Sequence, residues 1–205
     1  MNFRFKRIKT FAVLICSLLA AVSLSLGISG IYGANAETVT EIPNPGFEEL
    51  TANMPSGWTT WTALNDKDSS LANVSFSIER GDAAHDGVSM KIVNLSGDSM
   101  IRGVVNSSEF EVEGGKTYLL SFWYRSDSET ATGSLCVRQY TKSGAGTQNS
   151  WLWVDSATVV GATDGYRLIS AVFTTDSNAA KAMLQLDIAP TGENAVYYDD
   201  FSVEK

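Results

Sequence analysis

The chain has 205 residues and carries 23 Asp and Glu against 15 Lys and Arg, a formal net charge of −8. A protein this acidic is not expected to bind nucleic acid or anionic membranes, because both select basic patches. Of its two cysteines, Cys16 lies in the N-terminal segment and only Cys136 in the rest of the chain. That part cannot form an internal disulfide, so a hydrophobic core, with or without a metal, has to hold the fold.

The N-terminal segment predicts a secretory signal. A basic start over 4–9 is followed by an apolar run over 11–26 and by Ala34-Asn35-Ala36, the order of a signal peptide and its cleavage site. We expect residues 1–36 to be removed and the protein to be secreted and extracellular; a retained membrane anchor is the alternative. Residues 37–205 then form one domain with 11 basic and 23 acidic residues, a net charge of −12.

Short alternating segments follow through the rest of the chain. The segment 74–78 alternates strictly between apolar and polar residues, which is the period of a strand with one buried face. Further strands are expected at 89–93, 109–113, 118–125, 134–140, 151–154, 168–174, 182–188 and 196–203. Turn pairs such as Gly114-Gly115 and Asp164-Gly165 separate them. Many short strands at near-regular spacing predict an all-β protein, a β-sandwich with jelly-roll topology.

Five landmarks along the chain resemble one group of β-sandwich modules. They are Asn44-Pro45-Gly46-Phe47-Glu48, Pro55-Ser56-Gly57-Trp58, Asp86-Gly87-Val88-Ser89, the run from Gly114 to Phe122, and the run from Tyr197 to Val203. In this order and spacing they resemble the jelly-roll carbohydrate-binding modules of families four, nine, sixteen and twenty-two, which are galactose-binding-domain-like. One departure is Tyr166, where these families usually carry Trp. The resemblance implies a module that holds a glycan on a concave sheet and usually stands beside a catalytic domain, although function must still be argued from the site.

Strand alternation predicts which side chains form that sheet face. In the strand 118–125 the even positions are uniformly bulky and apolar, so Trp123 and Arg125 point away from the core. The same reasoning over two later strands gives a further outward set: Arg138, Tyr140, Gln185 and Asp187. Aromatic rings cover the C–H face of a sugar and planar polar groups pair with its hydroxyls. We therefore expect these six residues to form one carbohydrate-binding face.

The remaining tryptophans are assigned one by one. Trp58 follows a Pro-Ser-Gly turn and is expected to plug the core, whereas Trp61 could face either way. Trp151 and Trp153 share one face, but the alternation does not say which. Trp61 and Trp153 are included as candidate sugar contacts.

A metal site is expected near the closing strand. Asp199 shares its parity with Phe201 and Val203, the expected core face, and an inward carboxylate needs a cation or hydrogen bonds. Glu48 could supply a second oxygen ligand, and hard oxygen ligands suit calcium. The resemblance implies a structural calcium held by Glu48 and Asp199, with Asp86 as a further candidate; pairing of Asp199 with Lys or Arg is the alternative.

Candidate catalytic groups each have a simpler interpretation. His85 lies in a Gly-containing turn, where a His is usually solvated. Glu109, Glu111 and Glu113 alternate with apolar residues, as the solvated face of a strand does. Cys136 has no His near it in sequence and is interpreted as structural. We expect a non-catalytic, monomeric module that binds polysaccharide or oligosaccharide chains such as β-glucan, xylan or mannan, with no nucleic-acid partner and no membrane partner after signal cleavage. A structural or adhesive cell-surface domain of the same fold, and an enzyme of unrecognised type, are the alternatives.

Overall fold

The computed structural model describes residues 42–81, 83–84, 87–141 and 148–205, with the backbone only at 148–149. The chain divides into one unit of residues 1–36 and one of residues 37–205, and every described residue belongs to the second. The predicted signal peptide, His85 and Asp86 lie outside the described residues. Within the part that is described, no helix has the length and apolar character needed to cross a membrane.

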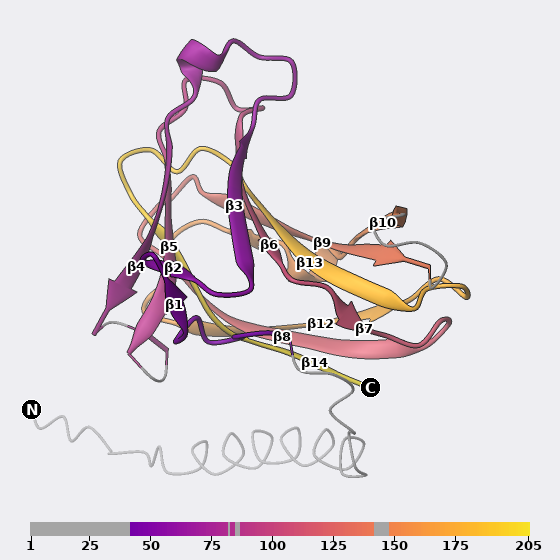
Figure 1. Ribbon diagram of the computed structural model, residues 1–205. Helices are drawn as coiled ribbons and strands as arrows, with labels where there is room; N and C mark the ends of the chain where they lie inside the picture. Colours follow the sequence, from indigo (N-terminus) through magenta and orange to yellow (C-terminus); the bar gives the residue numbers. More distant parts are fainter. Residues whose placement is uncertain (1–41, 82, 85–86, 142–147) are drawn as a thin grey trace, which may run out of the picture. The chain divides into compact units, whose positions relative to one another are not determined.

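The described residues form fourteen strands and two short 3-10 helices (Figure 1). Their bounds are β1 (Leu50–Thr51), β2 (Met54–Pro55), β3 (Trp58–Ala63), η1 (Ser69–Leu71), β4 (Val74–Arg80), β5 (Val88–Asn94), β6 (Arg102–Ser107), β7 (Phe110–Glu111), β8 (Thr117–Ser126), β9 (Thr132–Tyr140), β10 (Gln148–Trp153), η2 (Asp155–Ala157), β11 (Val159–Val160), β12 (Arg167–Thr174), β13 (Lys181–Ile188) and β14 (Val196–Glu204).

Two antiparallel sheets pack face to face, as Figure 1 shows. The larger sheet has the strand order β10-β9-β13-β6-β3, with β11 beside β9 and β7 beside β13. The smaller sheet has the order β12-β8-β14-β5-β4. Most neighbours within a sheet are far apart in sequence, because the chain crosses repeatedly between the two sheets. The predicted all-β sandwich of jelly-roll type is therefore confirmed.

The core is filled by alternate side chains of the two facing sheets. In β8, Phe122 is fully buried and Tyr124 is 1% exposed, as the predicted parity of this strand requires. The Phe122 ring stacks on Phe201 of β14 at 5.1 Å between centroids, and Tyr124 lies 5.3 Å from Tyr198. Leu184 of the larger sheet closes the core from the other side. Each fully buried side chain of this size contributes about 1.5–3 kcal/mol to the free energy of unfolding.

Three strands of the larger sheet were not predicted, and one was predicted too long. In β6, both Val104 and Val105 are fully buried, although they point to opposite faces of the sheet. The strand therefore lacks the alternation of polar and apolar residues that reveals a half-buried strand. The strand β3 and the two-residue strand β11 were missed as well. The predicted strand 109–113 shortens to β7, which pairs only through Phe110 and Glu111.

A β-bulge in β14 changes the orientation of the closing carboxylates. The pairing of β14 with β8 shifts between Asp199 and Ser202, and Asp200 has a positive φ of 46°. The extra residue reverses the parity of the strand, so Asp199 lies opposite Trp123 on the outer side of the smaller sheet. The prediction that Asp199 shares the core face of Phe201 is wrong for this reason.

Candidate functional site

The outer face of the larger sheet collects most of the predicted site residues. In an antiparallel sheet, residues directly opposite each other on neighbouring strands point to the same face. Gln185 of β13 lies opposite Cys136 of β9 and Asn106 of β6, and Cys136 lies opposite Trp153 of β10. Leu184, the neighbour of Gln185 in its strand, belongs to the core, so this row of four residues points away from the core.

Two further rows flank the first one. On one side, Asp187 of β13 lies opposite Val104 of β6, and Val104 lies opposite Trp61 of β3. On the other side, Arg138 of β9 lies opposite Trp151 of β10. Tryptophans therefore stand at both edges of the outer face, on β3 and on β10.

The edges of the outer face are exposed and aromatic, whereas its centre is buried and polar. Trp61 is 47% exposed, Trp151 48% and Trp153 46%. Between them, Gln185 is 3% exposed and Asn106 is 9% exposed. Exposed aromatic rings around a few converging polar groups are typical of a ligand site.

Contacts within the outer face hold part of it in place. The guanidinium of Arg138 lies 4.4 Å from the centre of the Trp151 ring, a cation–π contact. Its Nη1 atom also donates a hydrogen bond of 3.4 Å to Oε1 of Gln185. Arg138 therefore links the aromatic edge on β10 to the polar centre on β13.

Other polar groups at the centre lack such partners. Within the described part of the chain, Oδ1 of Asn106 and Oδ1 of Asp187 are buried and accept no hydrogen bond. Burial raises the pKa of the Asp187 carboxyl, and the nearby Arg102 and Gln185 offset this only in part. Burial also raises the pKa of the Cys136 thiol to about 12, so this thiol stays protonated at physiological pH.

Carboxyl groups are sparse among the described residues of the outer face. A glycosidase of the usual kind needs two carboxyl groups flanking the bond, and Asp187 is the one carboxyl at the described centre of this face. Glu109 and Glu111, at the margin, lie 3.4 and 3.9 Å from Nζ of Lys181. Glu113 pairs with Lys205. The acidic cluster noted in the sequence is therefore a set of surface ion pairs.

The structure brings six of the eight predicted sugar contacts to the outer face. They are Trp61, Arg138, Tyr140, Trp153, Gln185 and Asp187. Tyr140 lies opposite Lys181 and is 6% exposed, so it contributes little accessible surface. Trp58 is 6% exposed and contacts the Phe47 ring, as expected of a core residue.

Trp123 and Arg125 lie on the other sheet. Their strand, β8, pairs with β12 and β14 in the smaller sheet, so the expectation that they share one face with Arg138 and Gln185 is wrong. Alternation distinguishes the inside of a strand from its outside, but it does not assign a strand to a sheet. Arg125 is engaged there, 3.9 Å from the centre of the Tyr197 ring and 3.6 Å from the Asp127 carboxylate.

Sequence reasoning missed three residues of the outer face. Asn106 and Arg102 belong to β6, the strand that was not predicted. Trp151 was not assigned to either face of its strand. Because it shares its face with Trp153, locating one of these two residues locates the other. The cross-strand pairing with Arg138 provides that location.

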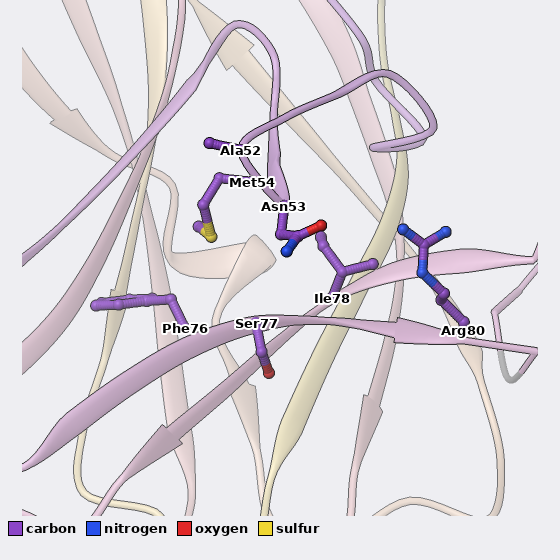
Figure 2. A pocket seen from close by; sticks show the side chains of 7 residues that line it. All are labelled: Ala52, Asn53, Met54, Phe76, Ser77, Ile78 and Arg80. Carbon is purple, nitrogen blue, oxygen red and sulfur yellow. The ribbon is translucent and has the colours of Figure 1, made fainter.

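A separate pocket lies at the edge of the sandwich beside the β1–β2 hairpin. It has a volume of about 430 Å³ and is lined by residues of that hairpin and of β4. Figure 2 shows Met54, Phe76 and Ile78 in its wall, with the guanidinium of Arg80 at one side. Arg80 is the one ionisable side chain among the described residues of this lining.

Two of the candidate metal ligands accept hydrogen bonds from backbone amides close to the start of β5. Oδ2 of Asp199 accepts a hydrogen bond of 2.9 Å from the Ala84 amide, and Oε1 of Glu48 accepts one of 3.2 Å from the Val88 amide. Asp199 is only 1% exposed. Within the described residues no group of three or more His, Cys, Asp or Glu side chains is arranged to hold a metal, and Asp86 lies outside them.

Close approach of the backbone to two carboxylates makes the metal prediction chemically reasonable. A Cβ atom on Gly46 would lie 2.7 Å from Oδ1 of Asp200 and 3.8 Å from Oδ1 of Asp199. A larger residue would therefore fill the space between the backbone and these oxygens. Carboxylate and backbone oxygens are the ligands that calcium prefers, so the groups beside Gly46 are of the right chemical type for a calcium ion.

Comparison with known proteins adds information about the fold. No protein-family profile and no curated protein matches the chain. A Clostridium thermocellum xylanase, Xyn10B, solved as CBM22-1–GH10 modules with xylohexaose, matches at 17% identity with a TM-score of 0.53. The match covers 84% of this chain but only 29% of the xylanase chain.

Two single modules match over nearly their whole length. The family 11 carbohydrate-binding module of Clostridium thermocellum, solved with a β-1,3-1,4-mixed-linked tetrasaccharide, has a TM-score of 0.53 at 13% identity, covering 82% of this chain and 96% of the module. The CBM22-1 xylan-binding domain of Paenibacillus barcinonensis Xyn10C has a TM-score of 0.51 at 15% identity, covering 82% and 97%. The chain therefore has the β-sandwich fold of the jelly-roll carbohydrate-binding modules.

Proposed function

We propose that the chain is a secreted, non-catalytic carbohydrate-binding module that holds a polysaccharide on the outer face of its larger sheet. The observation that carries the proposal is the pair of aromatic edges, Trp61 on β3 and Trp151 and Trp153 on β10, around a polar centre. A single exposed Trp is unremarkable, but three on one face leave much apolar area in water unless a ligand covers it.

The separation of the edges supports a chain rather than a single sugar as the ligand. Four strand spacings lie between β3 and β10, which is about 19 Å at the usual spacing of neighbouring strands. One sugar ring cannot contact both edges at once, whereas several linked rings can. The oligosaccharides bound by the xylanase and by the family 11 module are ligands of this kind, and β-glucan, xylan or mannan are the polymers we propose here.

The same observations support binding without catalysis. Asp187 is the carboxyl at the described centre of the face, and hydrolysis of a glycosidic bond by the usual route would need a second. The signal-like segment 1–36 supports secretion. In this proposal the module keeps a partner enzyme, or the cell that exports it, close to its polysaccharide.

We further propose a structural calcium ion near the start of β14. Glu48 and Asp199 would supply side-chain oxygens, with Asp86 as a candidate from the loop between them. The ion would neutralise the carboxylates that gather beside Gly46 and tie the N-terminal landmark to the last strand. Asp199 belongs to β14 of the smaller sheet, so the ion is expected to affect stability rather than to contact the sugar.

Affinity electrophoresis of residues 37–205 against soluble β-glucan, xylan and mannan tests the proposed function. Retardation by at least one polymer, without release of reducing sugar, is the expected result. If no polymer in an extended panel slows the migration of the protein, a structural or adhesive domain of the same fold is favoured. Release of reducing sugar that a single carboxylate substitution abolishes would favour an enzyme.

A further inference from the structure

The centre of the outer face contains two buried oxygen acceptors that the protein does not satisfy. Oδ1 of Asn106 and Oδ1 of Asp187 accept no hydrogen bond from the described residues. Asn106 is 9% exposed and Asp187 is partly buried. A buried acceptor without a donor costs about 1–3 kcal/mol, and more when it is charged. The described residues therefore leave this face short of two hydrogen-bond donors.

The two acceptors are close neighbours. Gln185 lies opposite Asn106, and Asp187 lies opposite Val104, so Asn106 and Asp187 are diagonal neighbours on adjacent strands of the same face. Diagonal pairs of this kind have Cβ atoms within about 7–8 Å of each other. Both lie between the aromatic edges, where the middle of a bound chain would pass.

Each acceptor can be turned toward a ligand. The Cβ–Cγ torsions of Asp and Asn are broad, without the sharp wells of an aliphatic torsion, so either oxygen can rotate toward the surface at small cost. By contrast, the donors of Arg138 are already directed at Gln185 and Trp151. The acceptors at the centre of this face therefore require hydrogen-bond donors from a ligand.

We propose that Asn106 and Asp187 together read free hydroxyl groups on the sugar at the centre of the bound chain, and so restrict the ligand to neutral glycans with unsubstituted hydroxyls there. The inference rests on the proposed function. Hydroxyl groups donate to both oxygens and complete their hydrogen bonding. A polymer whose hydroxyls are etherified lacks those donors, and an anionic sugar would place a second negative charge beside the Asp187 carboxylate.

This role has a signature that a purely structural role lacks. A residue that stabilises the fold lowers the melting temperature when it is truncated. An acceptor kept unsatisfied for a ligand does the opposite, because truncation removes a buried oxygen, Oδ1, that no described residue satisfies. The Asp187→Ala and Asn106→Ala variants are therefore expected to bind less tightly while melting at the wild-type temperature or above it.

The test combines isothermal titration with thermal melts, using the polymer that retards the wild-type protein most. Asp187→Ala should weaken binding about tenfold to a hundredfold, and Asn106→Ala about threefold to tenfold, as expected for charged and neutral hydrogen bonds. Glu129→Ala, at an exposed carboxylate in the loop between β8 and β9, is the matched control and should bind like wild type. The same polymer after O-methylation should bind wild type at least tenfold more weakly than the parent polymer.

Each contrary result has a distinct meaning. Wild-type protein that binds no polymer contradicts the proposed function itself. Wild-type binding that both variants retain in full overturns the inference while leaving the proposed function standing. A loss of affinity that comes with a fall of several degrees in melting temperature also overturns it, since the two residues would then be structural. Equal binding of the O-methylated and parent polymers rejects the requirement for free hydroxyls.

Discussion

Replacement of Trp153 by Ala separates the two sheets as candidate binding surfaces. Trp153 is 46% exposed, and an aromatic side chain buries roughly 200 Å² when fully covered. A sugar that covers the exposed half removes on the order of 90 Å² from water, which is about 2 kcal/mol at 25 cal/mol per Å². This agrees with the roughly 1–3 kcal/mol of aromatic stacking on a nucleic-acid base. The expected result is a loss of affinity of about thirtyfold.

The matched control is Trp123→Ala. Trp123 is also a partly exposed Trp on a sheet, but it stands on β8 in the smaller sheet, opposite Leu168 and Asp199. Its truncation should leave affinity within about twofold of wild type, because it removes no contact with a ligand on the larger sheet. Both variants are measured by isothermal titration with the same polysaccharide, after thermal melts have confirmed that they are folded.

The reversed pattern would refute the assignment. If Trp123→Ala loses affinity while Trp153→Ala and Trp61→Ala retain it, the glycan lies on the smaller sheet. The aromatic edges of the larger sheet would then have no ligand. If all three variants bind like wild type, neither sheet face is the site.

Three further predictions concern stability. Burial raises the pKa of Asp187 above its ordinary value of 3.8, so the cost of its charge is absent below pH 3.8 and is fully present once the pH exceeds the raised pKa. Asp187→Asn should therefore melt above wild type near neutral pH, and thermal melts should show this gain shrinking as the pH falls toward 3.8; a gain independent of pH would contradict the role of charge. Gly114→Ala would place a Cβ atom 2.2 Å from the backbone oxygen of Ser177 and should lower the free energy of unfolding in urea by about 1–3 kcal/mol. Gly97→Ala, whose Cβ would meet only Leu71 at 3.6 Å, is its control and should be nearly neutral. Calcium at a hundred times its dissociation constant should stabilise the protein by about 2.7 kcal/mol. Glu48→Gln and Asp199→Asn should reduce the accompanying rise in melting temperature, whereas an identical melting temperature with chelator and with calcium would show that the site does not exist.

The sequence predicts the inside and outside of individual strands well where alternation is strict. In β8, β9 and β13, apolar and polar residues alternate with few exceptions, so Phe122, Leu184 and Arg138 lie on the expected sides. Alternation is local, whereas the assignment of a strand to a sheet depends on pairings between residues far apart in the chain. For that reason Trp123 was grouped with residues of the other sheet.

Two further errors have equally specific causes. The residues of β6 show no alternation because side chains on both faces of this strand are buried, and Asn106 was missed with it. The bulge at Asp200 adds one residue to β14, a change that strand parity cannot anticipate. Asp199 is nevertheless as buried as the sequence suggested, and its Oδ2 atom accepts a hydrogen bond from the Ala84 amide.

The position of Cys136 provides a built-in probe of the proposed binding face. Its thiol lies between Trp153 and Gln185 in the central row, is fully buried, and has a pKa of about 12. A maleimide or disulfide reagent reacts with the thiolate. Because the thiol is buried and protonated, it can be labelled only when the outer face opens locally and exposes it. The labelling rate then reports the free energy of that opening, as amide hydrogen exchange does for the backbone. Since residues 37–205 contain no other cysteine, a glycan seated across the face should slow a single, unambiguous reaction, and its occupancy could be followed without any substitution.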